Sequence, residues 1–413
     1  MTEKIMSETT EKLNWELQSK KLQMHWLLQI TKAINYNLPS EQLYKIYESV
    51  IKDHLHAGKL SLFVNEGSWK QVLSYGMKEE LSKLQPEKLL EELQMSSTKE
   101  ISAPSWLEKD ESIIPVYHNE QLLAYSIVGN IKSTHDIPVR EVVPFIHTIT
   151  NIIVVAIENK RLNLQAVEQA AFRKELELAA EMQDMLFPVG LKGNEWFDVD
   201  SVYLPHQQVG GDYYDFISLN DYEHIFCMAD VSGKGMAAAL LMSNFQANLH
   251  ALIKNKLPLK ELVTELNACV NKSAKGEKFI TFFIGIINFK SHTLQYINAG
   301  HNPPVLCEKK SVRVLNKGTT GLGMFDELPF LNDETVTFEK GASVFCYTDG
   351  ITELENESGE FFGAENLHQF ISEKMASGTL KEFHGSLINH LDKYRQDSDY
   401  SDDVTILSLR ALA

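Results

Sequence analysis

The sequence contains few cysteines and no two of them in a CxxC spacing. Only four occur in 413 residues, and they are scattered at Cys227, Cys269, Cys307 and Cys346. This spacing excludes a disulfide framework or a cysteine-based zinc site. Two of the four fall in segments that we expect to be core strands, so we interpret them as small buried side chains in a reducing compartment. No cysteine lies in residues 1–155, which excludes a cysteine-attached cofactor there.

Long apolar runs and an excess of basic charge are also missing. The longest strongly apolar run, 152–157, is far shorter than the roughly 20 residues that span a bilayer. The first residues lack the apolar region of a signal peptide, so we expect a cytoplasmic protein. Lys and Arg number 39 against 56 Asp and Glu, a net charge of -17. Nucleic acids and anionic membranes need a basic face, so neither is expected as a partner.

The most informative stretch begins with an apolar run, 225–229, that predicts a buried strand. Asp230 follows, then a turn with two glycines and Lys234, then a segment, 236–253, with apolar residues at helical spacing. The carboxylate is therefore expected at a strand end, beside glycines that admit a ligand and a helix start that favours an anion. A plain strand-to-helix turn with a solvated Asp is the alternative.

Three further segments place acids beside glycines or strand ends. Asp212 follows two glycines, Asp349 ends an apolar run, and the pair Asp402 and Asp403 precedes one. Several carboxylates without a Cys/His cluster favour a hard cation with oxygen ligands, Mg²⁺ or Mn²⁺. Asp215 could support the site indirectly, although a turn or helix cap explains both Asp215 and Asp403 equally well.

In this order, these segments resemble the bacterial SpoIIE/RsbU-type serine/threonine phosphatases of the metal-dependent PPM (type 2C) superfamily. The segments 181–188, 296–304, 321–324 and 350–353 add to the resemblance, which covers about residues 180–411. It implies an α+β fold in which a PPM-type β-sandwich of two antiparallel sheets lies between helical layers.

The resemblance also implies a site with two Mn²⁺ or Mg²⁺ ions. Asp230 matches the metal-bridging acid, Asp349 and Asp402 match acids on one metal, and Asp212 lies at the second. Asp403 could substitute for Asp402, because sequence alone does not separate the pair. The two ions would activate water and neutralise the phosphate, so no Cys or His nucleophile is required. Asp230 and Asp349 are the expected catalytic residues, and the expected metal ligands are Asp212, Asp230, Val231, Asp349, Asp402 and Asp403.

Two features of eukaryotic relatives are missing, as in the bacterial subfamily. Ser232 occupies the position of a His suited to protonating the leaving group, and no phosphate-binding Arg precedes Asp212. Water, Lys234 or the substrate protein would have to supply these functions. His301 could act as an acid, but a turn such as 300–304 is more often structural.

The N-terminal part resembles a GAF sensory domain, on the order and length of its elements. Helices are predicted at 10–36 and 41–54, strands at 60–64 and 69–75, a charged helical stretch at 78–94, and a hairpin of 113–117 with 122–128. A small-molecule or protein signal would bind here. His54, His56, His118 and His147 are expected to be surface or structural residues.

A long helix is predicted from 138 to 187. Ile157, Leu164, Ala171, Leu178 and Met185 are seven residues apart, the spacing of a coiled-coil seam, although Lys174 and Glu181 interrupt the companion position. Because the linker of the resembled family dimerises, we expect a parallel homodimer through linker and sensor; a single helix packed on one domain is the alternative. The predicted domains are an N-terminal helix (1–22), a GAF-like α/β sensor (23–155), a helical coiled-coil linker (156–187) and a phosphatase (188–413).

The sequence therefore favours a sensor-regulated protein phosphatase. Its expected substrate is phosphoserine or phosphothreonine on a signalling protein, and the resembled family typically acts on a small antagonist of an anti-sigma factor. The alternatives are a catalytically weak dimeric scaffold that binds phosphoproteins and a ligand-binding sensor with an inactive C-terminal domain. Loss of the metal-site acids would favour either alternative, but the four matched acids, Asp212, Asp230, Asp349 and Asp402, are all present.

Overall fold

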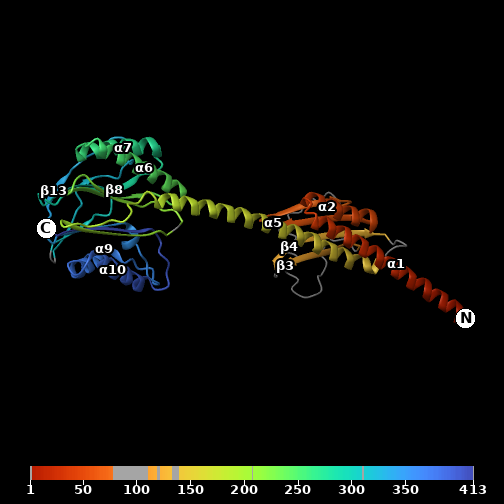
Figure 1. The fold of residues 1–413 in the computed structure, drawn as a ribbon. Coiled ribbons are helices and arrows are strands. Elements are labelled where there is room, and N and C mark those ends of the chain that lie inside the picture. The colour runs from red at the N-terminus through yellow and green to blue at the C-terminus, as the bar shows by residue number, and fades with distance from the viewer. Residues whose placement is uncertain are drawn as a thin grey trace. The chain divides into compact units, whose positions relative to one another are not determined.

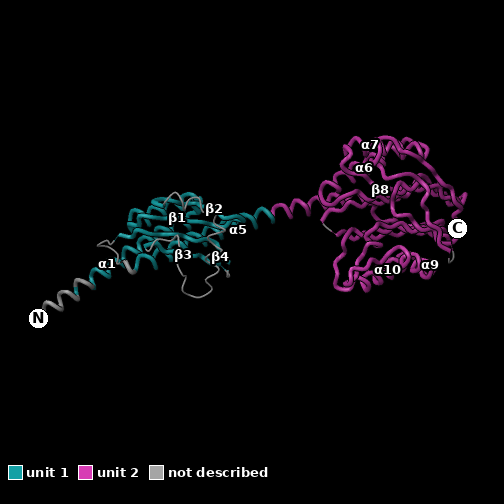
Figure 2. Tube along the Cα trace, turned by 180° about the vertical axis from the view of Figure 1, so that it is seen from behind, with its two compact units in different colours: residues 1–169 teal, residues 170–413 magenta. Residues whose placement is uncertain are grey.

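The computed structural model describes residues 2–77, 110–118, 121–132, 139–206, 208–308 and 311–412. The chain forms two compact units, residues 1–169 and 170–413 (Figure 2). One continuous helix, α5 (Val139–Asp184), begins in the first unit and ends in the second. The division between the units falls inside the segment 156–187 that was predicted to be a linker.

The first unit is built on a four-stranded antiparallel sheet with the strand order β2-β1-β4-β3. Alternate residues of β1, such as Leu60 and Leu62, point to one face of this sheet because side chains alternate along a strand. There they pack with Tyr47 and with Ile146 and Ile149 of α5. The elements are α1 (Thr2–Asn35), α2 (Ser40–Ser49), a π-helical turn η1 (Val50–His54), β1 (Ala57–Asn65), β2 (Trp69–Tyr75), β3 (Ser112–His118) and β4 (Gln121–Ile131).

Within the described residues, the predicted helices and strands of this unit overlap the observed ones, although α1 begins at Thr2 instead of residue 10 and the end of the predicted helix 41–54 is the π-helical turn η1. The predicted helical stretch 78–94 lies outside the described residues. An antiparallel sheet with helices packed on one face is compatible with a sensor domain, and the assignment to the GAF type stays a prediction.

Helix α5 changes character along its length. Its first half is part of the core of the first unit, where Ile146, Ile149 and Ile153 are fully buried. Beyond Leu162 its large apolar side chains are mostly exposed, including Leu164 and Leu178 of the predicted seam. By length and composition alone, Glu141–Asp184 would be long and apolar enough to cross a membrane. Of its apolar window, 44% is buried inside the protein.

The second unit is a sandwich of two sheets between two layers of helices, as predicted (Figure 1). The five-stranded sheet has the order β11-β10-β14-β15-β5, and the six-stranded sheet the order β12-β9-β8-β7-β6 with β13 on β9. All pairs are antiparallel except β12 with β9. Helices α6 (Met236–Lys254) and α7 (Leu259–Ala274) cover the six-stranded sheet, whereas α9 (Gly363–Lys374) and α10 (Leu380–Arg395) cover the other.

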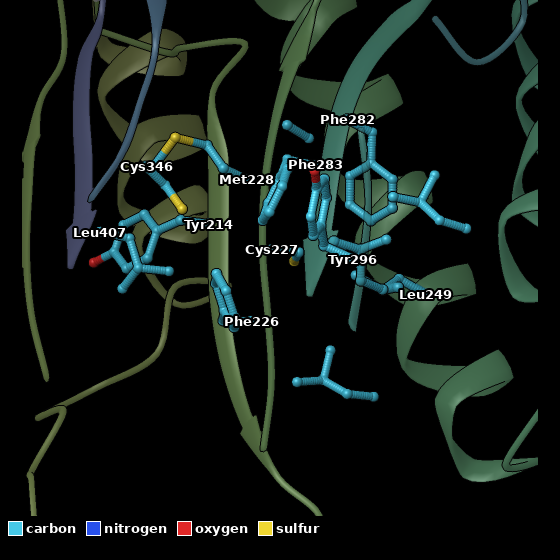
Figure 3. Close-up of a cluster of buried hydrophobic side chains, with 14 of the residues drawn as sticks. Tyr214, Phe226, Cys227, Met228, Leu249, Phe282, Phe283, Tyr296, Cys346 and Leu407 are labelled. Carbon is cyan, nitrogen blue, oxygen red and sulfur yellow. The ribbon is translucent and has the colours of Figure 1, made fainter. Parts of the chain in front are cut away.

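The strands of this unit alternate their apolar side chains between the sandwich interior and the helices. In Figure 3, Met228 lies near Cys346 and Leu407 of the opposite sheet. On the helix side, Phe282 packs edge-on against Phe245 of α6. The strands are β5 (Phe197–Leu204), β6 (Tyr213–Ser218), β7 (Glu223–Val231), β8 (Ile280–Asn288), β9 (Thr293–Ala299), β10 (Val305–Glu308), β11 (Ser311–Val314), β12 (Gly318–Thr319), β13 (Glu334–Thr337), β14 (Ser343–Tyr347) and β15 (Val404–Ala411).

The four cysteines are free thiols, and three of them are buried, as expected for small apolar side chains. Four short strands, β6, β11, β12 and β13, and the four-residue helix α8 (Asp349–Thr352) were not predicted from the sequence. These elements are too short or too polar to show a clear local periodicity, and they are held by pairing with neighbouring strands or by the end of β14.

Candidate active site

The ends of several strands bring most of the predicted acids to one cleft of about 360 Å³. Asp230 and Val231 end β7, Asp349 follows β14 as the first residue of α8, and Asp402 and Asp403 precede β15. The lining is completed by two loops, one before β6 and one before α6. The residues around the cleft are His206, Val209, Gly210, Gly211, Asp230, Val231, Ser232, Gly233, Lys234, Gly235, Phe279, Thr281, Asp349, Asp402 and Asp403.

Asp212 lies behind this cleft and does not line it. Its side chain is buried and accepts a hydrogen bond from the hydroxyl of Thr405 on β15. Burial, followed by the charge of Asp230, raises the pKa of the Asp212 carboxyl well above its usual range. The Asp212 carboxylate therefore interacts electrostatically with Asp230, although it is shielded from solvent.

The adjacent acids Asp402 and Asp403, which sequence could not separate, have different surroundings. The Asp403 carboxylate is buried and accepts hydrogen bonds from the backbone N–H of His206 (2.8 Å) and of Gly211 (3.1 Å). Asp402 is more exposed, and its Oδ2 lies 2.8 Å from Nζ of Lys234. Asp403 thus holds the loop before β6 in place, whereas Asp402, whose Oδ1 accepts a hydrogen bond from the Asp403 N–H (2.9 Å), faces the cleft with the Lys234 ammonium as its side-chain partner.

The carboxylates of the cleft raise one another's pKa values. Burial, reinforced by Asp349 and Asp402, raises the pKa of the Asp230 carboxyl to about 7. Burial, reinforced by Glu353 and Asp402, likewise raises the pKa of Asp349. Within the described lining, Lys234 is the only Lys or Arg. Such a surplus of negative charge favours the binding of a divalent cation.

The donor set and the backbone around it suit a hard cation that retains several waters. In the described part of the chain, no three His, Cys, Asp or Glu side chains form by themselves a group that could hold a metal ion. Backbone oxygens and water would therefore have to complete the coordination, as they commonly do for Mg²⁺. A Cβ on Gly211 would lie 3.0 Å from the carbonyl oxygen of Val231 and 3.3 Å from Oδ1 of Asp230. Glycine at this position keeps the space beside both oxygens open.

Two polar residues of the loop before α6 have distinct contacts. The Ser232 hydroxyl accepts a hydrogen bond from the Phe279 N–H (2.9 Å), and the Ser232 carbonyl accepts one from Nζ of Lys278 (2.8 Å). Ser232 therefore fastens its turn to the start of β8. Lys234 instead reaches the loop before β15, where its Nζ also donates to the carbonyl oxygen of Ser401 (2.8 Å). Lys234 can exchange these contacts for an anion in the cleft.

Replacing Ser232 by Ala should leave any turnover at this cleft nearly unchanged, because its hydroxyl is engaged by the Phe279 N–H. The lost hydrogen bond should cost about 1 kcal/mol of unfolding free energy. Steady-state kinetics and thermal denaturation of the variant test both values. A fall in turnover of about a hundredfold, the scale of a lost general acid, would show that the hydroxyl takes part in the chemistry.

Two other residues considered from the sequence lie outside the lining of the cleft. His301 is buried, its Nδ1 lies 2.9 Å from the Thr281 hydroxyl, and burial lowers its pKa to about 3. A neutral, enclosed imidazole supports the structural interpretation over the acid. Asp215 accepts a hydrogen bond from the Tyr213 hydroxyl, and its Oδ2 lies 2.6 Å from Nε2 of His250. This pairing gives Asp215 a role in tying β6 to α6.

Sequence reasoning missed Gln183, in the last turn of α5. Its buried amide makes two hydrogen bonds with Gly210: Nε2 donates to the carbonyl oxygen (2.8 Å), and Oε1 accepts from the N–H (3.1 Å). The next residue, Gly211, donates to Asp403. The end of the long helix is thus connected to the acid-bearing loop, and no local sequence pattern distinguishes this Gln from the exposed polar residues beside it.

Comparison with known proteins agrees with this geometry. Residues 220–412 match the family model described as stage II sporulation protein E (SpoIIE). Phosphoserine phosphatase RsbU of Bacillus subtilis (strain 168) is 30% identical over 248 residues, which cover 59% of this chain and 71% of RsbU. Phosphoserine phosphatase RsbP of the same organism is 25% identical over 189 residues, or 43% of this chain and 45% of RsbP.

A solved structure supports the fold independently. The SiaA-PP2C domain of Pseudomonas aeruginosa superposes with a TM-score of 0.54 at 19% identity, over 59% of this chain and 99% of that domain. At this level of identity, the similarity shows a shared architecture.

Proposed function

The chain belongs to the SpoIIE family of serine/threonine phosphatases, and from this premise we propose that it is a sensor-regulated enzyme that needs two Mn²⁺ or Mg²⁺ ions. Its substrate is phosphoserine or phosphothreonine on a signalling protein. The observation that carries the proposal is the cleft in which Asp230, Asp349 and Asp402 converge with Lys234 as the one cationic side chain of the described lining. Scaffold function without catalysis has no comparable observation in its favour.

The proposal assigns each residue a task. Asp230 would be shared by the two ions with the Val231 carbonyl nearby as a further ligand, Asp349 and Asp402 would hold one ion, and Asp212 would lie at the second. When bound, the ions supply Lewis acidity that activates water and neutralises the phosphate. Between Asp402 and Asp403, the geometry favours Asp402 as the metal ligand, because Asp403 is engaged by two backbone N–H groups.

The remaining work falls to residues that position and protect the site. Asp403 holds the loop before β6 through its two backbone hydrogen bonds, and Thr405 fixes the Asp212 carboxylate from behind. If Asp402 serves as a metal ligand, Lys234 would lose its ion pair with that acid. Its ammonium would then be able to contact a phosphate oxygen at the mouth of the cleft. Because no covalent intermediate is needed, the buried cysteines and histidines stay outside the chemistry.

The decisive experiment measures hydrolysis of p-nitrophenyl phosphate by the full chain with Mn²⁺ and with excess chelator. Activity should require the metal and return when Mn²⁺ is restored, because the carboxylates of the cleft need a divalent cation to activate water and to offset the charge of the phosphate. Undiminished turnover in excess chelator would refute the metal mechanism. Absence of hydrolysis under every metal condition would refute the proposed enzyme.

Metal binding should also stabilise the protein in a pH-dependent way. With a folded pKa of about 7 against 3.8 for an ordinary Asp, Asp230 keeps its proton in the folded state over a range where the unfolded chain has lost it. The unfolding free energy therefore falls as pH rises through this window and stays low above it. Because a divalent cation replaces the proton, Mn²⁺ should raise Tm more at about pH 7.5 than at about pH 5. Equal shifts at both values, measured by calorimetry, would contradict the carboxylate site.

The partners follow from the same proposal. The substrate is a phosphorylated protein, and a small antagonist of an anti-sigma factor fits the resemblance of the catalytic unit. We further propose that the chain works in the cytoplasm as a homodimer through linker and sensor, and that a small molecule or protein bound to the first unit sets its activity. The exposed apolar side chains of α5, among them Leu164 and Leu178, are available for such pairing.

A further inference from the structure

A loop, residues 321–326, is joined to the strand that carries Thr281 of the catalytic cleft. Phe279 and Thr281 line the cleft, and Ile280, the first residue of β8, lies between them in the chain. Leu322 exchanges two backbone hydrogen bonds with Ile280, of 2.8 and 2.9 Å. The loop is therefore attached next to two residues that line the cleft.

The segments that flank the cleft expose large apolar side chains. In the loop, Met324 is 45% and Phe325 50% exposed, although the adjacent Leu322 is fully buried. Helix α6 begins directly after Gly235 of the cleft, and it exposes Met236 (37%) and Leu240 (64%). We call these four side chains, Met236, Leu240, Met324 and Phe325, the apolar rim. Exposed apolar groups on segments that adjoin a functional cleft are candidates for a binding surface.

The backbone that carries the rim is held rigidly. Asn267 of α7 is buried, its Oδ1 accepts from the Gly323 N–H (2.9 Å), and its Nδ2 donates to the carbonyl oxygens of Phe325 (3.1 Å) and Asp326 (3.2 Å). Asn271 donates a further hydrogen bond to the Phe325 carbonyl (2.8 Å). Gly323 has a φ of +84°, and a Cβ there would lie 2.6 Å from Val270 Cγ1. A loop fixed in this way presents its side chains with little ordering cost on binding.

The occupant of the rim follows from the reaction beside it. A phosphorylated side chain that enters the cleft carries its polypeptide across the edge, so residues flanking the phosphate must lie on the surrounding surface. The loop before β15, on another side of the cleft, is acidic, with Asp397 and Asp399 exposed next to Asp402. Apolar residues that flank the phosphate would therefore bury more apolar surface beside Met324 and Phe325 than beside the acidic loop.

We propose that the apolar rim docks the polypeptide of the phosphoprotein substrate and selects substrates with apolar residues next to the phosphoserine. This inference rests on the proposed function and deepens it, because it concerns specificity at the same cleft. The rim contributes contact area outside the reacting centre, so it should act on protein substrates and leave small phosphate esters unaffected.

The test compares two phosphoserine peptides with p-nitrophenyl phosphate as a third substrate. One peptide has Leu and Phe beside the phosphoserine, and its partner has Ser and Gly there. The wild-type chain should prefer the apolar peptide, and the double substitution of Met324→Ser with Phe325→Ser should lower kcat/KM for that peptide by about tenfold or more, mainly through KM. Turnover of p-nitrophenyl phosphate should not change. Phe361→Ser is the control, because Phe361 is similarly exposed (58%) but lies directly before α9, which covers the five-stranded sheet, whereas the loop 321–326 is bonded to β8 of the six-stranded sheet.

Each other outcome overturns the inference. Equal use of both peptides by the wild-type chain would show that the rim does not select apolar sequences. An equal loss on the peptide and on p-nitrophenyl phosphate would show that the loop supports the catalytic centre instead. A change in sedimentation of the double variant would identify a second copy of the chain as the occupant. Failure of the wild-type chain on p-nitrophenyl phosphate with Mn²⁺ would instead refute the proposed function itself.

Discussion

Replacing Asp349 by Asn should lower phosphatase turnover by about a hundredfold or more in a protein that remains folded. Asp349 lines the cleft beside Asp230 and Asp402, and its charge is one of the causes of the raised pKa of Asp230. Asn keeps the size of the side chain but removes a negative ligand, and even residues that only orient metal ligands cost about 10- to 100-fold when changed. The contacts that hold α8 at this position use the Asp349 backbone carbonyl, which the substitution retains.

The same substitution has a second expected effect that separates metal binding from folding. Without metal, Asp349→Asn should be at least as stable as the wild-type chain, because one source of repulsion around Asp230 is removed. The rise in Tm that Mn²⁺ produces should become smaller. Asp397→Asn, which changes an exposed acid outside the cleft, should behave as the wild-type chain in both measurements. A variant that keeps wild-type turnover, or that loses activity only because it unfolds, would contradict the assignment of Asp349.

The second large effect concerns the helix that enters the catalytic unit. Replacing Gln183 by Ala removes both of its hydrogen bonds to Gly210. The buried N–H and the buried carbonyl of Gly210 then lose these partners. The unfolding free energy should fall by about 1–3 kcal/mol. Because the neighbouring Gly211 N–H binds Asp403, a loosened loop should also raise the Mn²⁺ concentration for half-maximal activity, by about tenfold. Gln169→Ala, an exposed Gln earlier in the same helix, is the control and should change neither quantity.

The contact of Gln183 offers a physical route for the predicted control by the sensor. If the two linker helices of a dimer can pair in two registers that differ by only a few kcal/mol, strengthening one register should hold phosphatase turnover at one level. Ala171 lies on the predicted seam, and Glu175 takes the companion position when that register is shifted by one residue. Ala171→Leu with Glu175→Leu makes both positions apolar, so it should tighten dimerisation and change basal turnover. With Gln183→Ala added, dimerisation should stay tight while the effect on turnover is lost. If the seam variant dimerises more tightly but has wild-type turnover and metal affinity, the linker is a passive tether. Sedimentation and kinetics decide between these outcomes when they are measured on the wild-type chain, the seam double variant, Gln183→Ala and the combination of the seam variant with Gln183→Ala.

Local sequence pattern was sufficient for most elements and for the chemistry of the site. The periods of apolar residues predicted the strand 69–75 with the bounds that the structure has, and α6, expected at 236–253, within one residue, because side chains alternate with period two in strands and 3.6 in helices. Acids at the ends of apolar runs predicted a carboxylate cleft, since an apolar strand ends where the chain leaves the core. The order of these motifs also identified the family.

Only the tertiary structure decided which groups meet. It separated Asp402 from Asp403 because the second accepts hydrogen bonds from His206 and Gly211, almost two hundred residues earlier in the chain. It placed Asp212 behind the cleft, and it brought Gln183 to Gly210. It also added β6, whose polar and aromatic residues have no clear period but pair along β7. Periodicity reports which face of an element is buried, whereas hydrogen bonds between distant segments depend on how the sheets and loops pack, which no local pattern records.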